Sequence, residues 1–292
     1  MRSRWLLLLL ILFLNLFFSA CRKHKSSSPI GIPELPGGGN DTVPNEPGGP
    51  GPMPASYNQV PIYQRIGENV GGYYEALPPS YDSSDKQFPL LVFLHGGGEL
   101  GDGSPDMLPL IARNSVTERL EEKTLPTSFT SNGQSFSFVI ISPQFEEWPS
   151  VEDVHVVIEH ALSKYRIDRS RIYLAGLSMG GGATWEYAGS EHGNLLAAIV
   201  PICGASWADS AVAKKIAANE VPAWAFHNED DAVVTVNSTK RYARLINAEN
   251  PKYPVKVTYW PIGGHDAWTK SSDPEYREEG MNMYEWMLQY TR

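Results

Sequence analysis

The chain has 292 residues, 42% of them hydrophobic and 20% charged, with a formal net charge of −9. This composition is typical of a globular protein and excludes a fibrous or mainly disordered chain. The excess of acidic residues repels phosphate backbones, which argues against nucleic acid as the principal partner.

The N-terminal segment predicts export. Two arginines, at positions 2 and 4, precede an apolar run over residues 5–18, a run of 14 residues where a bilayer-spanning helix needs about 20. This is the layout of a secretory signal peptide over residues 1–20. The string FSAC at residues 18–21 resembles the bacterial lipobox, which implies cleavage before Cys21 and a lipid on its thiol. The alternatives are ordinary secretion, with Cys21 lost or incidental, and a permanent membrane helix.

A linker follows the lipidation site. Residues 29–54 contain eight prolines and seven glycines in 26 positions. Such a segment cannot bury enough apolar surface to offset its chain entropy, so we expect a tether over residues 21–54. The other 238 residues, 55–292, carry 19 basic and 30 acidic side chains, a net charge of −11, and suffice for one domain with a full core. Cys203 is expected to pack in that core.

Apolar, β-rich runs alternate with helical patterns along this domain. Continuous apolar runs predict buried strands at residues 88–94, 136–141, 171–175, 196–202, 222–226 and 255–260. Apolar residues at helical spacing predict helices at residues 151–165, 181–188, 238–247 and 275–290. The less regular stretch 57–77 is expected to supply an antiparallel hairpin at the sheet edge. The alternation indicates an α/β fold, with a mainly parallel central sheet flanked by helices in a single catalytic domain.

The segment GLSMG at residues 176–180 directly follows one predicted strand and begins a helical stretch. A serine hydroxyl is a poor nucleophile near neutral pH, so it needs a neighbouring base and a backbone turn that exposes it. Glycines permit the sharp strand-to-helix turn known as the nucleophile elbow of α/β-hydrolases. We therefore expect Ser178 to be the nucleophile. A glycine-rich turn with a bystander serine is the alternative.

A base and an orienting acid are expected after Ser178, the acid first and the histidine second. Histidines follow Ser178 only at positions 192, 227 and 265. His265 lies in the loop GGHD just past a predicted strand, at the carboxyl end where such folds place their ligands. His265 is therefore the expected general base.

The string HNEDDAVV at residues 227–234 carries a family resemblance. It resembles the string His-Gly-x-x-Asp-x-x-Val of serine esterases of the α/β-hydrolase superfamily, particularly the feruloyl esterase, acetylxylan esterase and polyhydroxyalkanoate depolymerase-like group. The resemblance implies an α/β-hydrolase fold and assigns the orienting acid to Asp231, with Asp230 as the alternative. The chain departs from the family string at Asn228, where the family has glycine.

These assignments define a mechanism. His265 takes the proton of Ser178 during attack on an ester carbonyl, Asp231 fixes the imidazole tautomer, and water later cleaves the acyl-enzyme. This chemistry needs no cofactor. Histidines and cysteines at zinc-binding spacing are absent from the sequence, so no metal is expected.

The attack creates an oxyanion, which backbone N–H groups are expected to stabilise. One donor is expected from Met179, the residue after the nucleophile, and one from the loop HGGG at residues 95–98. Resemblance to the esterases favours Gly97 as this second donor, with Gly98 as the alternative. His95 is expected to brace its loop, and His227 to be a structural hydrogen-bonding residue at the end of its strand.

Aromatic and acidic residues near the expected site leave the substrate open. Trp148, Trp207 and Trp268 lie in loops after predicted strands or beside the expected base. They either stack on an aromatic acyl group or a sugar ring, or pack under their loops. Glu99 and Asp102 either bond substrate hydroxyls or brace the oxyanion loop.

Together these features predict a lipid-anchored serine hydrolase of the bacterial cell envelope, on the periplasmic side or at the cell surface. Resemblance alone suggests carbohydrate esters, feruloyl or acetyl, as substrates. The expected partners are a small ester or an esterified polysaccharide, and a membrane reached through the lipid on Cys21. The alternatives are a prolyl oligopeptidase-like serine peptidase and a carbohydrate-binding lipoprotein without catalysis.

Overall fold

The computed structural model describes residues 56–292, which form a single domain. The predicted signal peptide, Cys21 and the tether through residue 54 lie outside the described residues. Within residues 56–292, none of the helices combines the length and the hydropathy needed to cross a bilayer.

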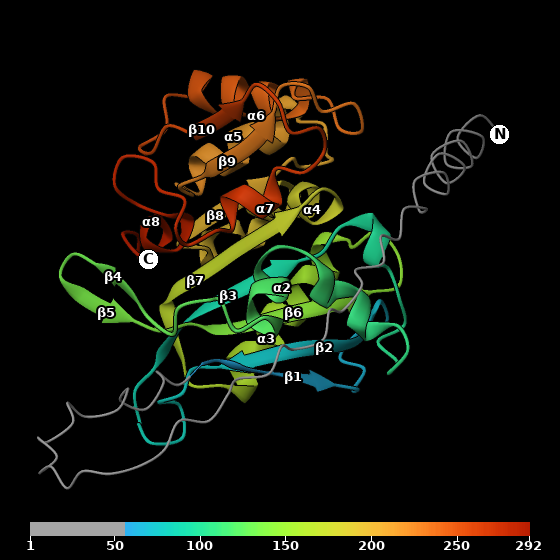
Figure 1. Cartoon of the computed structure of the whole chain (residues 1–292). Coiled ribbons are helices and arrows are strands. Elements are labelled where there is room, and N and C mark those ends of the chain that lie inside the picture. Colours follow the sequence, from blue (N-terminus) through green and yellow to red (C-terminus); the bar gives the residue numbers. More distant parts are fainter. Residues whose placement is uncertain (1–55) are drawn as a thin grey trace, which may run out of the picture. The chain divides into compact units, whose positions relative to one another are not determined.

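An eight-stranded sheet runs through the domain in the order β1-β2-β6-β3-β7-β8-β9-β10 (Figure 1). The strands are β1 (Asn58–Ile62), β2 (Val70–Leu77), β3 (Phe88–Leu94), β6 (Val139–Phe145), β7 (Ile167–Leu177), β8 (Ala198–Ile202), β9 (Trp224–Asn228) and β10 (Lys256–Trp260). The strands β6, β3, β7, β8, β9 and β10 are all parallel to one another. The strands β1 and β2 form an antiparallel hairpin at one outer edge of the sheet, where β2 pairs antiparallel with β6. The predicted parallel sheet and its edge hairpin are confirmed.

The central strands are apolar because both of their faces are covered. Every residue of β3, with the sequence FPLLVFL, is buried. Leu90 and Val92 pack in the core on one face, and Leu91 and Phe93 pack in the core on the other. Successive side chains of a strand point to opposite faces, so a strand between two helical layers needs a continuous apolar run.

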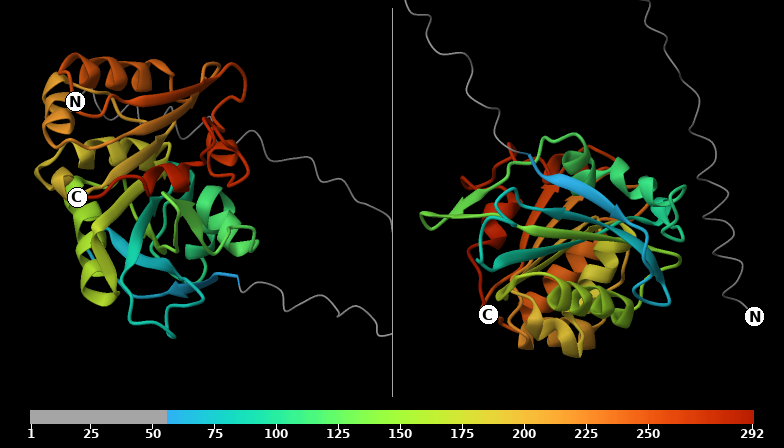
Figure 2. Two further views of the ribbon diagram at one scale, coloured as in Figure 1. Left: turned by 90° about the vertical axis from the view of Figure 1, so that its left-hand side faces the viewer. Right: turned by 90° about the horizontal axis from the view of Figure 1, so that it is seen from below.

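Helices cover both faces of the sheet (Figure 2). The hydrophobic core cluster on one face of the sheet includes residues of α3 (Val151–Lys164), α4 (Met179–Ala188), α5 (Ser210–Ala218) and α6 (Asn237–Ala248). The opposite cluster includes residues of α2 (Ser115–Glu121) and α8 (Met283–Met287). Shorter elements are η1 (Gly97–Glu99), η2 (Leu108–Arg113), η3 (Glu191–Leu195), α7 (Trp268–Ser271) and the hairpin of β4 (Phe129–Ser131) and β5 (Gln134–Phe136).

Two predicted elements differ from the structure. The apolar run 136–141 is divided, because its first residue ends β5 and β6 begins only at Val139. The predicted helix 275–290 is reduced to the five residues of α8. Gly280 has φ 83°, a backbone conformation through which an α-helix cannot continue. The side chain of Asn282 then caps the start of α8 by accepting from the N–H of Glu285 at 2.9 Å.

Because these strands are parallel, their carboxyl ends all lie on one side of the sheet. We call this side, formed by the ends of β3, β7, β8, β9 and β10, the carboxyl or catalytic edge, as distinct from the outermost strands. The loops that carry the candidate residues follow it. Tyr57 lies on the opposite side, at the amino ends of these strands. Its hydroxyl donates to the carbonyl of Phe138, one residue before β6, and accepts from the N–H of the same residue. The C-terminal Arg292 also lies on that side, where its N–H donates to the carbonyl of Ser170 at 3.0 Å.

Candidate active site

Ser178 lies on the sharp turn between β7 and α4. Its backbone has φ 50° and ψ −114°, a conformation that residues other than glycine rarely adopt. Two flanking glycines make the turn possible. A Cβ on Gly176 would lie 2.6 Å from the carbonyl carbon of Gly180, and a Cβ on Gly180 would lie 2.3 Å from the carbonyl oxygen of Leu94. The segment GLSMG therefore folds as a strand-to-helix turn, with its serine at the carboxyl edge of the sheet.

His265 reaches Ser178 from the loop after β10, and Asp231 reaches His265 from the loop after β9. His265 Nε2 lies 2.9 Å from Ser178 Oγ, and His265 Nδ1 lies 2.7 Å from Asp231 Oδ2. Since Nδ1 must donate its proton to the carboxylate, Nε2 keeps a lone pair that accepts from the serine hydroxyl. A base thus lies beside the hydroxyl, which is the arrangement that nucleophilic catalysis requires.

Asp231 is an ionised carboxylate in a buried position. Its side chain is fully buried, and its Oδ1 accepts from the N–H groups of Val233 and Val234, each at 2.9 Å. Burial alone would raise the pKa of Asp231, but hydrogen bonds from His227, His265 and the backbone of Val234 hold that pKa well below its usual range. The negative charge needed to stabilise an imidazolium is therefore present at neutral pH.

The neighbouring carboxylate of Asp230 has a different partner. Its Oδ1 accepts from the N–H of Gly264 at 2.8 Å. Asn228, which replaces the glycine of the family string, donates through Nδ2 to the carbonyl of the same glycine at 3.0 Å. Asp230 and Asn228 thus brace the loop that carries His265, while Asp231 holds the ring itself.

The loop after β3 packs against the nucleophile turn. His95 Nε2 accepts from the N–H of Phe145 at 3.0 Å, so Nδ1 carries the proton that it donates to the carbonyl of Gly96 at 2.6 Å. Burial lowers the pKa of His95 to about 4, so the ring is neutral. The carbonyl of His95 in turn accepts from the N–H of Gly180 at 3.0 Å. His95 therefore braces the loop and ties it to the turn that carries Ser178.

The expected oxyanion donors lie at the first turns of two helices. The N–H of Gly96 donates to Glu99 Oε2 at 2.6 Å, so it is not free for a ligand. Gly97 and Gly98 begin η1, and the first N–H groups of a helix lack intrahelical acceptors. A Cβ on either glycine would meet no atom within 4 Å, so both face open space. Met179 is the first residue of α4.

Both acidic residues beside this loop bond to the protein itself. Glu99 accepts from the N–H of Gly96 and from the side-chain amide of Asn114. Asp102 Oδ1 accepts from the N–H of Ser104 at 3.0 Å. These contacts support loop bracing over contact with substrate hydroxyls. Asn114 was not found by sequence reasoning, because it lies 15 residues from Glu99 in a segment without a recognisable motif.

The three candidate tryptophans have different surroundings. Trp268 packs edge-on against the His265 ring, with centroids 5.3 Å apart and planes at 89°. Trp148 and Trp207 are 48% and 60% exposed, in the loops after β6 and β8. The guanidinium of Arg241 lies 5.3 Å from the centroid of the Trp207 ring. Two exposed indole rings therefore stand on the same edge of the sheet as Ser178.

The part of the chain that the structure describes contains two separate clusters of residues that could bind a metal ion. One consists of Cys203, Asp231 and His265, and the other of Glu152, Glu191 and His192. In the first group, Asp231 and His265 already bond each other. In the second, His192 Nε2 pairs with the exposed Glu152 at 3.1 Å. Contacts within the protein thus account for both groups.

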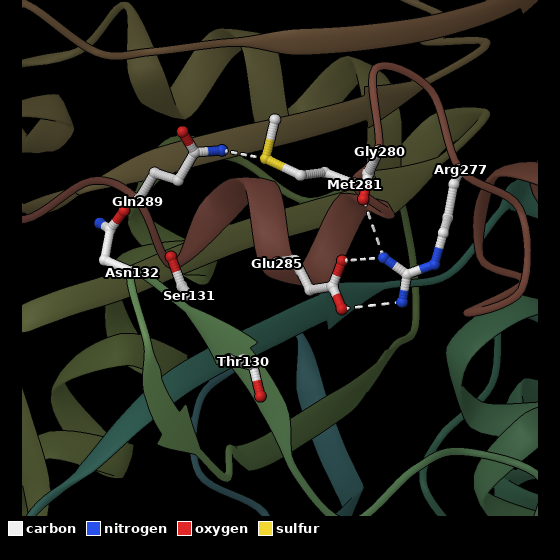
Figure 3. Close-up of a pocket in the computed structure, with 8 residues that line it drawn as sticks. All are labelled: Thr130, Ser131, Asn132, Arg277, Gly280, Met281, Glu285 and Gln289. Atoms are coloured by element: carbon white, nitrogen blue, oxygen red, sulfur yellow. Dashed lines mark hydrogen bonds and ion pairs between the residues drawn. The ribbon is translucent and has the colours of Figure 1, made fainter.

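A pocket away from Ser178 lies between the β4–β5 hairpin and the C-terminal segment (Figure 3). Arg277 and Glu285 meet in it as a two-pronged ion pair, with Nη2 and Oε1 2.9 Å apart. The pair satisfies the charge of both side chains, so the pocket offers a ligand mainly neutral polar groups.

The fold and the grouping of Ser178, His265 and Asp231 at the carboxyl edge of the sheet define an α/β-hydrolase. A family profile described as phospholipase/carboxylesterase matches residues 81–272. The chain belongs to this family of carboxylesterase-type serine hydrolases.

Similar solved structures include several esterases. A thermostable esterase is 25% identical, with a TM-score of 0.61 over 81% of this chain and 64% of that protein, so this chain spans less than two thirds of its length. A feruloyl esterase module from Clostridium thermocellum, complexed with sinapinate, is 18% identical, with a TM-score of 0.55 over 77% of this chain and 87% of the module. A ferulic acid esterase is 17% identical, with a TM-score of 0.55 over 75% and 96%. These last two share the fold. Comparison with curated proteins finds no match.

Proposed function

We propose that this protein is a serine esterase that hydrolyses carboxylic esters through an acyl-enzyme on Ser178. The observation that carries the proposal is the unbroken chain of hydrogen bonds from Ser178 Oγ through His265 to the ionised Asp231. Membership of the phospholipase/carboxylesterase family supports the same reaction class.

The mechanism follows from the proton positions. Ser178 Oγ attacks the carbonyl carbon of the ester while its proton passes to His265 Nε2, and Asp231 stabilises the imidazolium that forms. The backbone N–H groups of Met179 and of Gly97, or Gly98, receive the charge of the oxyanion. The imidazolium then protonates the leaving alcohol as the carbon–oxygen bond breaks. Water, deprotonated by the same ring, attacks the acyl-enzyme and releases the acid.

We propose that the ester belongs to a carbohydrate, with a feruloyl or acetyl group as the acyl part. The exposed rings of Trp148 and Trp207 on the catalytic edge support this class, because indole faces stack on sugar rings and on aromatic acyl groups. The guanidinium of Arg241 holds one side of the Trp207 ring, so the ring is partly immobilised before a substrate arrives. The shared fold with feruloyl esterases agrees with this assignment.

A hydrolysis panel tests the proposal. We would compare methyl ferulate, acetylated xylan, tributyrin and an aminoacyl-proline amide, each with the wild type and with Ser178→Ala. A carbohydrate esterase turns over the first or second substrate, and Ser178→Ala abolishes it. Preferential cleavage of the amide would establish the peptidase alternative. Binding of xylan without turnover of any substrate would establish the non-catalytic alternative.

We also propose that the protein is held in the bacterial cell envelope by a lipid on Cys21. A radioactive fatty acid should label the wild type and leave Cys21→Ala unlabelled. Equal labelling of both proteins would refute the lipid assignment.

A further inference from the structure

A second histidine lies against the carboxylate of Asp231. The side chain of His227, on β9, is fully buried, and its Nε2 lies 3.2 Å from Asp231 Oδ2. This is the same oxygen that accepts from His265 Nδ1. Two imidazoles therefore flank one carboxylate, His265 on the side of Ser178 and His227 on the side of the core.

The contacts of His227 determine where its proton lies. Nε2 faces two acceptors, Asp231 Oδ2 and the carbonyl oxygen of Val234 at 2.8 Å, so Nε2 must carry a hydrogen. Nδ1 lies 2.8 Å from the hydroxyl of Thr239 on α6, which can donate to it. A neutral ring with its proton on Nε2 satisfies every contact and adds no charge to a buried position.

We propose that His227 is a positioning residue, which fixes Asp231 in the orientation that His265 needs; its kinetic consequences rest on the proposed esterase function. With His227 present, the Asp231 carboxylate accepts from two backbone N–H groups at Oδ1 and from His265 at Oδ2, and His227 Nε2, whose hydrogen is shared with the carbonyl of Val234, lies 3.2 Å from the same Oδ2. A carboxylate has about four lone-pair sites, so this set is complete. The carboxylate cannot rotate without breaking one of these bonds.

The proposal predicts a change in the pH profile as well as in rate. The N–H of His227 draws on the same charge that attracts the proton of His265. Without that N–H, the interaction between Asp231 and the imidazolium changes in strength, so the acid limb of the profile of kcat/KM moves. Asp230, Asp266 and Cys203 are titratable groups near the pair, and the variants leave all three unchanged.

Three variants at position 227 separate positioning from simple packing. His227→Phe keeps a ring and removes the donor. His227→Gln places an amide nitrogen where Nε2 was, whereas His227→Asn places it where Nδ1 was. We expect His227→Phe and His227→Asn to lower kcat about 10- to 100-fold with KM nearly unchanged, since the contact removed involves a charged acceptor. His227→Gln should recover most of the loss.

A control variant removes side-chain hydrogen bonds from the neighbouring strand. Thr258 on β10 accepts from Trp224 Nε1 at 2.9 Å and donates to Glu278 Oε2 at 2.7 Å, so Thr258→Val removes both bonds without touching Asp231. This variant should lower stability and leave the pH profile in place. Equal activity of the Gln and Asn variants, or an unmoved acid limb in His227→Phe and His227→Asn, would overturn the proposal.

A measurement without turnover keeps this inference distinct from the proposed function. The hydrogen on His265 Nδ1, bound to Asp231, can be followed as a low-field proton resonance. The resonance should persist in His227→Gln and broaden or move in His227→Asn. If the wild type hydrolyses no ester and the resonance still responds in this way, the proposed function fails and the positioning role stands. An identical resonance in both variants refutes the positioning role.

Discussion

The side chain of Asn228 lies in the space that Gly263 leaves open. A Cβ on Gly263 would lie 2.4 Å from Asn228 Nδ2, and that amide donates to the carbonyl of the next residue, Gly264, at 3.0 Å. The loop that carries His265 is therefore held against the end of β9 by a contact that tolerates no side chain at position 263.

Gly263→Ala should misplace His265 and lower kcat/KM about 10²-fold, because small displacements of catalytic groups are costly. Asn228→Gly removes the clashing amide, so Gly263→Ala/Asn228→Gly should be more active than Gly263→Ala alone. Kinetics of the wild type, the two single variants and the double variant give the coupling between the positions. Additive losses would show that the two residues do not act through this contact.

The hydroxyl of Ser178 is the proposed nucleophile, and the backbone of the same residue is strained. Ser178→Ala should abolish hydrolysis of a short-chain aryl ester and leave the free energy of unfolding nearly unchanged. Ser178→Gly should also be inactive but more stable than the wild type by about 1 kcal/mol, because glycine adopts a φ of 50° without strain. Urea denaturation measures the difference. A glycine variant less stable than Ser178→Ala would refute the strain argument.

The two adjacent carboxylates should differ sharply in their effect on turnover. Asp231→Asn leaves an amide facing His265 and favours the wrong imidazole tautomer, so kcat should fall about 10⁴-fold. Asp230→Asn retains an oxygen that can accept from Gly264, so its loss should stay below about 10-fold. Steady-state kinetics with one aryl ester decide the matter, and the reverse order would make Asp230 the orienting acid.

Features that depend on local chain geometry follow from the sequence. The continuous apolar run of β3 predicts a strand buried on both faces, and GLSMG predicts the turn at Ser178, because each depends on residues next to one another. The prediction of a helix over residues 275–290 is wrong, and the cause is again local. Its apolar spacing is helical, but a glycine at φ 83° and a capping asparagine interrupt it, and periodicity alone does not register either effect.

Contacts between distant segments are beyond sequence reasoning. The choice between Asp230 and Asp231 needed a family resemblance, because both carboxylates lie in one loop and only the fold determines which faces His265. The bond from Asn114 to Glu99 and the contact between Asn228 and Gly263 join segments 15 and 35 residues apart. Neither leaves a signal in spacing or composition.

His95 should make the stability of the domain depend on pH. Burial lowers its pKa from 6.5 to about 4, so the unfolded chain binds a proton between these pH values and the folded chain does not. The resulting stability is complete above about pH 6.5 and is lost as the pH falls toward 4. His95→Gln should be less stable at pH 7.5 and show a flatter decline, measured by urea denaturation from pH 7.5 to 4.5. Burial also lowers the pKa of His160, so a residual slope is expected. An unchanged slope would refute the assignment to His95.

Trp207 should contribute to substrate binding rather than to chemistry. Its ring is 60% exposed on the catalytic edge, so Trp207→Ala should raise KM for methyl ferulate about 10-fold and leave kcat within about threefold. Arg241→Gln should raise KM less, because it removes only the group that holds the ring. Tyr253→Ala is the control, since Tyr253 packs against Tyr290 near the opposite edge of the sheet. The effect should be smaller for an acetyl ester, which offers no acyl ring. An equal effect on both esters would contradict contact between the acyl ring and Trp207.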